Sequence, residues 1–203
     1  LSASSMDTVW ETPMEAQGWP SPALSDGTIV LHLPDGLHLV RPDGSAGPVI
    51  PAVLAPGLVS TDTSDQIWGF APGDGDNLEL VGLNIRGQRL AGVSILGEPT
   101  QPPVPLPDGS VAVVTGLGVM VARGGSISWE KALPGGKGMM ATGTRDMHLL
   151  VKGGGMLTLL RGGPHRVWSV RVPGGEAITA NPVVTADGGV CVAAGLKIYS
   201  LER

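Results

Sequence analysis

Short apolar runs alternate with turn residues along the whole chain. In the C-terminal stretch, four such runs are separated by Gly, Pro, Asn and Asp. Each run has the length of a short strand and is rich in Val, Ile and Leu, and no window keeps apolar residues at helical spacing without a Gly or Pro. The pattern predicts strands over residues 166–172, 182–185, 189–194 and 196–201.

The pattern repeats along the chain. Trp168 in the first of these runs has a counterpart in Trp129, 39 residues earlier. The turn after the Pro-Val-Val run carries an aspartate in five copies, 39, 43, 38 and 41 residues apart, at Asp26, Asp65, Asp108, Asp146 and Asp187. An arginine closes the third strand of each copy, at Arg41, Arg86, Arg123, Arg161 and Arg203. Two independent markers therefore predict five repeats.

The repeat length is that of a four-stranded antiparallel sheet. One such sheet cannot bury both of its faces, so successive sheets must stack around an axis. The sequence thus predicts an all-β fold, a five-bladed β-propeller of four-stranded antiparallel blades forming a single domain over residues 1–203. In the first repeat, the second and third strands are expected over residues 28–33 and 37–41.

The two ends of the chain are expected to meet. The chain ends at Arg203 before a fourth strand of the last repeat, whereas residues 8–14, with Trp10, precede the first repeat. Residues 8–14 are therefore predicted to be a clasp strand that completes the last sheet and closes the ring, after a leader over residues 1–7. The alternative is an open arc of a larger propeller.

Composition narrows the functional classes. The 203 residues carry 13 basic and 18 acidic side chains, so no basic surface for nucleic acid is expected. No apolar run approaches the length of a membrane-spanning helix. Cys191 is the single cysteine, which excludes an intramolecular disulfide and a thiolate metal cluster. The Ser-rich start is compatible with a removed signal or a lipid anchor, and an extracytoplasmic (periplasmic or cell-surface) location is expected.

The last repeat resembles a known family. Its order of Trp168, Pro-Val-Val, Asp187-Gly188, a Val-rich strand and Ile-Tyr-Ser-Leu is similar to the repeat of quinoprotein-type (PQQ-like) propellers, which include a propeller lipoprotein of the outer-membrane barrel assembly machinery. That family holds both quinone-dependent dehydrogenases and non-catalytic scaffolds. The resemblance implies for the enzymes a vicinal cysteine pair and a calcium-binding set, which this sequence lacks, so it favours the non-catalytic branch.

No catalytic, cofactor-binding or metal-binding residue is assigned. The five predicted inner strands contain no Asp or Glu, which argues against a glycosidase. The acidic cluster at 74–77, with Asp62 and Asp65 upstream, could suggest calcium, but Asp-Gly turn chemistry explains it better. The four histidines, His32, His38, His148 and His165, show no metal-ligand spacing. His32 and His148 are expected in second strands and His38 in a third strand, and they are interpreted as neutral, half-buried strand residues.

Two surface features remain as candidate sites. The five arginines named above are expected on one face, as an anion-binding or docking ring, or paired with aspartates between blades. The opposite face carries apolar loop residues expected to contact a protein partner or plug the channel, at Trp19, Leu96, Met139 and Met140.

From these observations the sequence predicts a non-catalytic scaffold or accessory subunit that binds protein partners in a larger assembly, with no cofactor and no enzymatic activity. A lectin-like propeller that binds a small ligand or glycan is the first alternative. A quinoprotein-like enzyme is the second.

Overall fold

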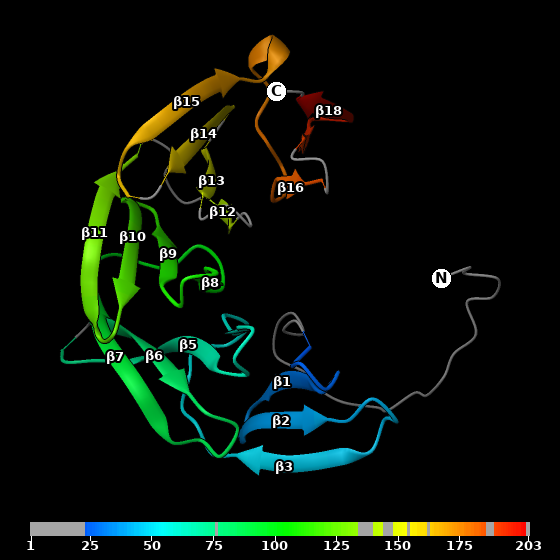
Figure 1. The fold of residues 1–203 in the computed structure, drawn as a ribbon, viewed down its shortest axis with the longest axis vertical. Helices are drawn as coiled ribbons and strands as arrows, with labels where there is room; N and C mark the ends of the chain where they lie inside the picture. The colour runs from blue at the N-terminus through cyan, green and yellow to red at the C-terminus, as the bar shows by residue number, and fades with distance from the viewer. Residues whose placement is uncertain are drawn as a thin grey trace.

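The computed structural model describes residues 23–75, 77–133, 140–143, 148–153, 155–161, 163–185 and 189–201. They form five antiparallel sheets that follow one another around an arc (Figure 1). No described helix is long and apolar enough to cross a membrane.

The strands run in chain order within each sheet, as expected for a repeat protein. Sheet 1 consists of β1 (Ile29–Leu33), β2 (Gly36–Val40) and β3 (Ala46–Ile50). Sheet 2 consists of β4 (Ser60–Thr61), β5 (Ile67–Pro72), β6 (Leu78–Leu83) and β7 (Arg89–Ile95). Sheet 3 consists of β8 (Val104–Pro105), β9 (Val111–Thr115), β10 (Gly118–Arg123) and β11 (Ser126–Ala132).

Sheet 4 consists of β12 (Met140–Gly143), β13 (His148–Gly153), β14 (Met156–Arg161) and β15 (Arg166–Arg171). Sheet 5 consists of β16 (Val183–Val184), β17 (Val190–Ala194) and β18 (Lys197–Leu201). The 3-10 turn η2 (Pro173–Gly175) leads from sheet 4 to sheet 5. The strands of the last repeat and of the first lie within a few residues of their predicted positions.

Aspartates build the turns that precede β1 and β9. A carboxylate oxygen of Asp26 accepts a hydrogen bond from the Thr28 backbone N–H at 2.8 Å, and Asp108 accepts one from that of Ser110 at 3.0 Å. The glycines that follow, Gly27 and Gly109, have φ of 84° and 77°, which side chains disfavour. The predicted Asp-Gly turn chemistry is present at both positions.

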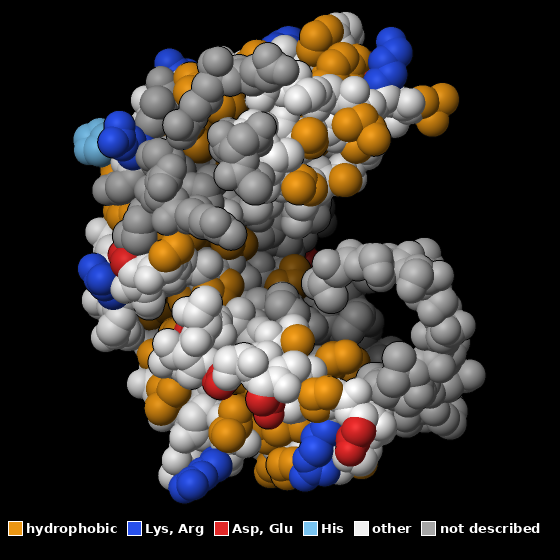
Figure 2. All heavy atoms as spheres, turned by 45° about the vertical axis from the view of Figure 1, so that its right-hand side comes forward, with side chains coloured by type: hydrophobic (Ala, Val, Ile, Leu, Met, Phe, Trp, Pro, Cys, Tyr) orange, Lys and Arg blue, Asp and Glu red, His pale blue; other side chains and the backbone are white. Residues whose placement is uncertain are grey.

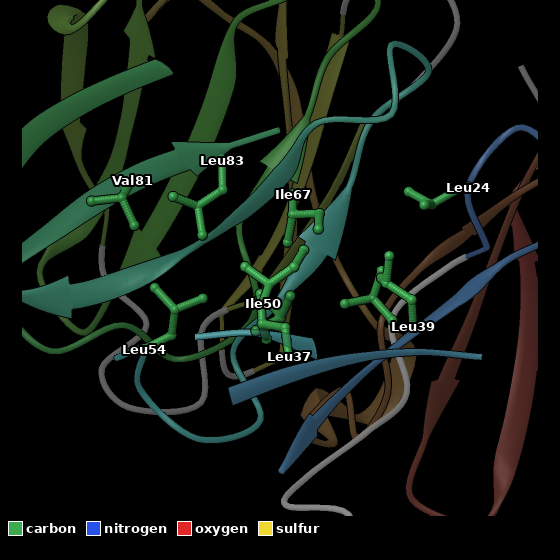
Figure 3. Close-up of a cluster of buried hydrophobic side chains, with 10 residues drawn as sticks. Leu24, Leu37, Leu39, Ile50, Leu54, Ile67, Val81 and Leu83 are labelled. Atoms are coloured by element: carbon green, nitrogen blue, oxygen red, sulfur yellow. The ribbon is translucent and has the colours of Figure 1, made fainter. Parts of the chain in front are cut away.

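The core lies between sheets rather than within one. In the first cluster, Leu37 and Ile50 of sheet 1 pack against Ile67, Val81 and Leu83 of sheet 2. Figure 3 shows these side chains converging from both sheets. Three further clusters join sheets 2 and 3, sheets 3 and 4, and sheets 4 and 5. Each inner sheet therefore buries both faces, as the stacking argument predicted.

The tryptophans of the repeat belong to these seams. Trp129 packs against the cluster between sheets 3 and 4, and Trp168 against the cluster between sheets 4 and 5. A large aromatic ring fills the space between outer strands. Trp10 lies outside the described residues.

Hydrogen bonds join the inner parts of neighbouring sheets at a spacing of 40 residues. The Ser25 backbone N–H donates to Asp65 at 2.7 Å, and the Thr142 hydroxyl donates to the Pro182 carbonyl at 2.9 Å. Gln101, which is 4% exposed, donates from Nε2 to the Ala141 carbonyl at 3.0 Å and accepts from the Ala141 N–H at 2.7 Å. These contacts join sheet 1 to sheet 2, sheet 3 to sheet 4, and sheet 4 to sheet 5.

The arc is open among the described residues. Sheets 1 and 5 have three described strands each, and no described strand pairs with the outer edge of β18. Hydrophobic side chains gather on the surface where sheet 5 ends the arc (Figure 2), including Val183, Leu196 and Ile198. The predicted clasp strand, residues 8–14, and the leader, residues 1–7, lie outside the described residues.

Candidate functional site

A cavity of about 350 Å³ lies in the seam between sheets 3 and 4. Its walls come from β11 on one side and from β13, β14 and β15 on the other. The volume is within the range of small-molecule sites. A hydrophobic cluster fills the rest of this seam, as other clusters fill the seams between the remaining neighbouring sheets.

Sheet 4 supplies the floor of this cavity. Val151, Thr158 and Ser169 pair directly across three adjacent strands, so their side chains lie in one row on the face toward sheet 3. The hydroxyl oxygens of Thr158 and Ser169 are 2.8 Å apart and share one hydrogen bond. Thr158 is only 8% exposed. One hydroxyl proton of the pair is left to bind another acceptor, because only one can lie between the two oxygens.

A β-bulge brings a cation to the same face. Leu159 pairs with Trp168, but the next residue, Leu160, pairs with Arg166, so β15 has one extra residue at this point. A bulge turns the following side chains to the other face of the sheet. Arg166 therefore lies on the same face as Leu160, which packs in the seam toward sheet 3. Its exposed side chain lines the cavity.

Sheet 3 supplies the second cation. Trp129, Lys131 and Leu133 are two residues apart along β11 and just beyond it, so their side chains lie on the same face. Trp129 and Leu133 pack in the seam toward sheet 4, and Lys131 therefore lies on that face too. Lys131 and Arg166 therefore line the same cavity, from sheet 3 and sheet 4 respectively. No acidic side chain is among the described residues of the lining. The site is a polar and cationic pocket with an apolar part formed by Leu133, Val151 and Met156.

The predicted partner-contact residues are only partly described. Leu96 follows β7 and is 60% exposed. The neighbouring Gly97 approaches Leu117, at the turn between β9 and β10, so the two kinds of loop do share a face. The backbone of Met140 begins β12, while Trp19 and Met139 lie outside the described residues. None of these residues lines the cavity.

The predicted arginine ring lies away from the cavity. Arg123 and Arg161 end β10 and β14, Arg41 directly follows β2, and Arg86 lies in the turn after β6, while Arg203 lies outside the described residues. Arg41 donates to the Ala46 carbonyl of its own turn at 2.9 Å. Arg123 donates to the Asp108 carbonyl at 2.8 Å and lies 3.6 Å from the Asp108 carboxylate, within one sheet. The role of this ring remains a prediction.

Two buried polar residues occupy matching places in sheets 1 and 4. His32 and Lys152 each precede the residue that closes its hairpin, and they are 7% and 5% exposed. Burial lowers the pKa of both side chains, because the charged form loses hydration. Lys152 Nζ donates to the Ile178 carbonyl at 2.9 Å, whereas His32 Nδ1 has no hydrogen-bond partner among the described residues. His32 lies in strand β1, as the sequence predicts, but it is buried rather than half-buried. The sequence pattern does not indicate the buried lysine.

The acidic turn residues are engaged locally. Asp62 accepts hydrogen bonds from the Ser64 backbone at 2.8 Å and from the Trp68 indole at 2.9 Å. Among the described residues, no three His, Cys, Asp or Glu side chains gather into a group that could hold a metal ion.

Comparison with known proteins establishes the fold. The chain matches a gluconolactonase from Xanthomonas campestris with a TM-score of 0.59 and 15% identity, over 88% of this chain and 69% of the other. It matches a catalytically inactive virginiamycin B lyase from Staphylococcus aureus with a TM-score of 0.65 and 11% identity, over 95% and 72%. It also matches the calcium-binding protein regucalcin from Agrobacterium tumefaciens with a TM-score of 0.53 and 16% identity, over 87% and 67%.

These structures are β-propellers, and the chain has a β-propeller fold. No protein-family profile matches the sequence, and no curated protein matches it at a significant level. The likeness supports the predicted propeller class, and it does not extend to the barrel-assembly lipoprotein.

The comparison also corrects the functional prediction. The sequence predicts a non-catalytic scaffold that is not an enzyme, and this prediction is wrong. The propellers that the chain resembles include a gluconolactonase and virginiamycin B lyases, so the resemblance does not favour a non-catalytic branch. The absence of Asp and Glu from the predicted inner strands does not exclude activity, because a site can also lie between two sheets, away from the axis.

Proposed function

We propose that this chain is a β-propeller domain that binds a small organic molecule between sheets 3 and 4 and acts on it as an enzyme. The observation that carries the proposal is the 350 Å³ cavity with a hydroxyl pair on its floor and cations on both walls. A cavity of this size with a few polar groups among apolar ones is the usual form of a small-molecule site.

Each part of the lining has a chemical role in this proposal. Leu133, Val151 and Met156 contact the apolar part of the ligand, while Thr158 and Ser169 orient a hydroxyl or carbonyl group. A cation beside a carbonyl oxygen stabilises negative charge that develops there during acyl transfer or elimination. The resemblance to a gluconolactonase and to virginiamycin B lyases supports testing turnover as well as binding.

Replacement of Thr158 by valine tests this site. The change keeps the shape but removes one hydroxyl of the pair, so we expect the affinity for a seam-bound ligand to fall about tenfold. A fragment collection screened by protein-observed NMR provides the ligands, and the same set, with lactones and esters added, is tested for turnover. Thr179→Val, at an exposed residue on the connection before β16, is the matched control and should leave affinity unchanged. A screen in which no fragment shifts the Thr158 and Ser169 signals would refute the proposal.

We further propose that the ring has five blades and is closed by residues 8–14 beside β18. The open outer edge of β18 and the three described strands of sheet 5 support this arrangement.

Deletion of residues 1–14 is therefore expected to lower the melting temperature by about 5 °C, because sheet 5 loses a strand. Deletion of residues 1–7 alone removes the predicted leader and should change it by less than about 1 °C. Equal melting temperatures for the two truncated chains would favour the alternative, an open arc of a larger propeller. Differential scanning calorimetry provides the measurement.

A further inference from the structure

Another sheet of the protein has an arginine at the position equivalent to Arg166. Sheet 2 has the same bulge as sheet 4: Gly82 pairs with Ala91, and then Leu83 pairs with Arg89. Arg89 is thus the counterpart of Arg166. The Arg89 guanidinium binds the carboxylate of Glu79 on the neighbouring strand.

The acidic partner is missing in sheet 4. Glu79 lies four residues before Leu83, and the residue four before Leu160 is Met156. Gly92 in β7 and Ser169 in β15 lie at the same distance in sequence from their bulges, three residues after Arg89 and Arg166 respectively, so they occupy equivalent positions. A side chain at Gly92 would overlap the Arg89–Glu79 pair, so this pair lies directly over that position. The corresponding space over Ser169 belongs to the cavity.

Both cations of the cavity are free of partners in the described part of the chain. The ion pairs there involve His38, Arg89 and Arg123, and neither Lys131 nor Arg166 takes part in one or donates a side-chain hydrogen bond. Lys131 is half-buried, so part of its side chain is already held in place by the seam. Two positive charges with no described acidic side chain beside them in the cavity attract an anion.

We infer that Lys131 and Arg166 bind the carboxylate of a small organic acid, in the place that the Glu79 carboxylate takes in sheet 2. The inference rests on the proposed function and specifies its ligand. The planar guanidinium fork fits a carboxylate by two parallel hydrogen bonds, as glutamate fits it in sheet 2. Ser169 and Thr158 lie next to this position and bind a further oxygen of the acid.

The test adds the missing acid to sheet 4. Met156→Glu restores the carboxylate that sheet 2 has and should neutralise Arg166 from within, while Met156→Gln is nearly isosteric and uncharged. The probes are benzoate and phthalate, their neutral counterpart benzamide, and inorganic phosphate, each titrated into the folded protein by NMR. We expect benzoate and phthalate to bind at least tenfold more tightly than benzamide, and this preference to weaken as salt rises.

The variants separate the possible outcomes. The preference for benzoate over benzamide should disappear in Met156→Glu and Arg166→Gln. In Met156→Gln both affinities should fall together, because Met156 contacts the apolar part of the ligand, and their ratio should persist within twofold. Dispersed spectra would show that each variant is folded. Equal binding of benzoate and benzamide in the seam would overturn the carboxylate assignment but leave the proposed function standing. Tighter binding of phosphate than of benzoate would also overturn it. If none of the probes binds in the seam, and the fragment screen finds no other ligand there, both conclusions fail.

Discussion

Replacement of Phe70 by alanine is expected to lower the free energy of unfolding by about 3–5 kcal/mol. Phe70 in β5 lies in the seam between sheets 2 and 3 and is the largest fully buried side chain among the described residues. It packs with Leu80 of its own sheet and with Val113 and Met120 of the next. Removal of the ring therefore leaves a cavity that two rigid sheets cannot close. Urea unfolding followed by tryptophan fluorescence measures the change.

The control is Leu90→Ala in the same sheet. Leu90 is 51% exposed, so its truncation should cost less than about 0.5 kcal/mol. A cost below about 1 kcal/mol for Phe70→Ala would mean that sheets 2 and 3 do not pack as described.

Replacement of Gln101 by alanine is the second large effect, expected to cost about 2–3 kcal/mol. The Gln101 amide makes both of its hydrogen bonds to the backbone of Ala141, which is 2% exposed. Without that side chain, the N–H and carbonyl of Ala141 lose these partners inside the protein, which costs more than an exposed hydrogen bond contributes. The same residue also protects the inner edge of β12 from other strands.

Gln88→Ala provides a matched comparison, because the exposed Gln88 amide accepts from Asn84 at a turn between β6 and β7. Its loss should cost less than about 0.5 kcal/mol. Hydrogen exchange at Ala141 gives a local reading: protection should fall in Gln101→Ala and be unchanged in Gln88→Ala. Similar costs for the two variants would show that Gln101 does not join sheets 3 and 4.

Much of the fold can be predicted from the sequence because its determinants are local. The strand expected over 189–194 is β17, Val190–Ala194, with buried and half-buried residues in strict alternation. The Asp-Gly turns follow from the short side chain of Asp and the positive φ of Gly, which depend on adjacent residues alone. The stacking of sheets follows from strands such as β9, whose five residues are all buried and so need a neighbour on each face.

The candidate site could not be predicted in the same way. Arg166 reaches the cavity because of a bulge, and the alternation of apolar residues does not indicate which strand pair carries one. Lys131 lies two residues after Trp129, on the same face of β11, where the alternating pattern predicts a buried apolar side chain. A comparison between repeats does indicate the site. Leu83, which pairs with Arg89, is preceded four residues earlier by Glu79, whereas Leu160, which pairs with Arg166, is preceded by Met156.

Some expectations from the sequence remain predictions. These are the extracytoplasmic location and the roles of the apolar loop residues and the arginine ring. The cavity does not depend on these three expectations. Its lining residues lie in sheets 3 and 4, apart from Leu133, which directly follows β11.

A crystal structure of the protein soaked with phthalate tests the central claim most directly. The account predicts the ligand in the seam between sheets 3 and 4, with one carboxylate between Lys131 and Arg166 and an oxygen near the Thr158–Ser169 pair. A ligand bound instead at the axis, or a seam filled by the protein's own side chains with no ligand, would contradict the account.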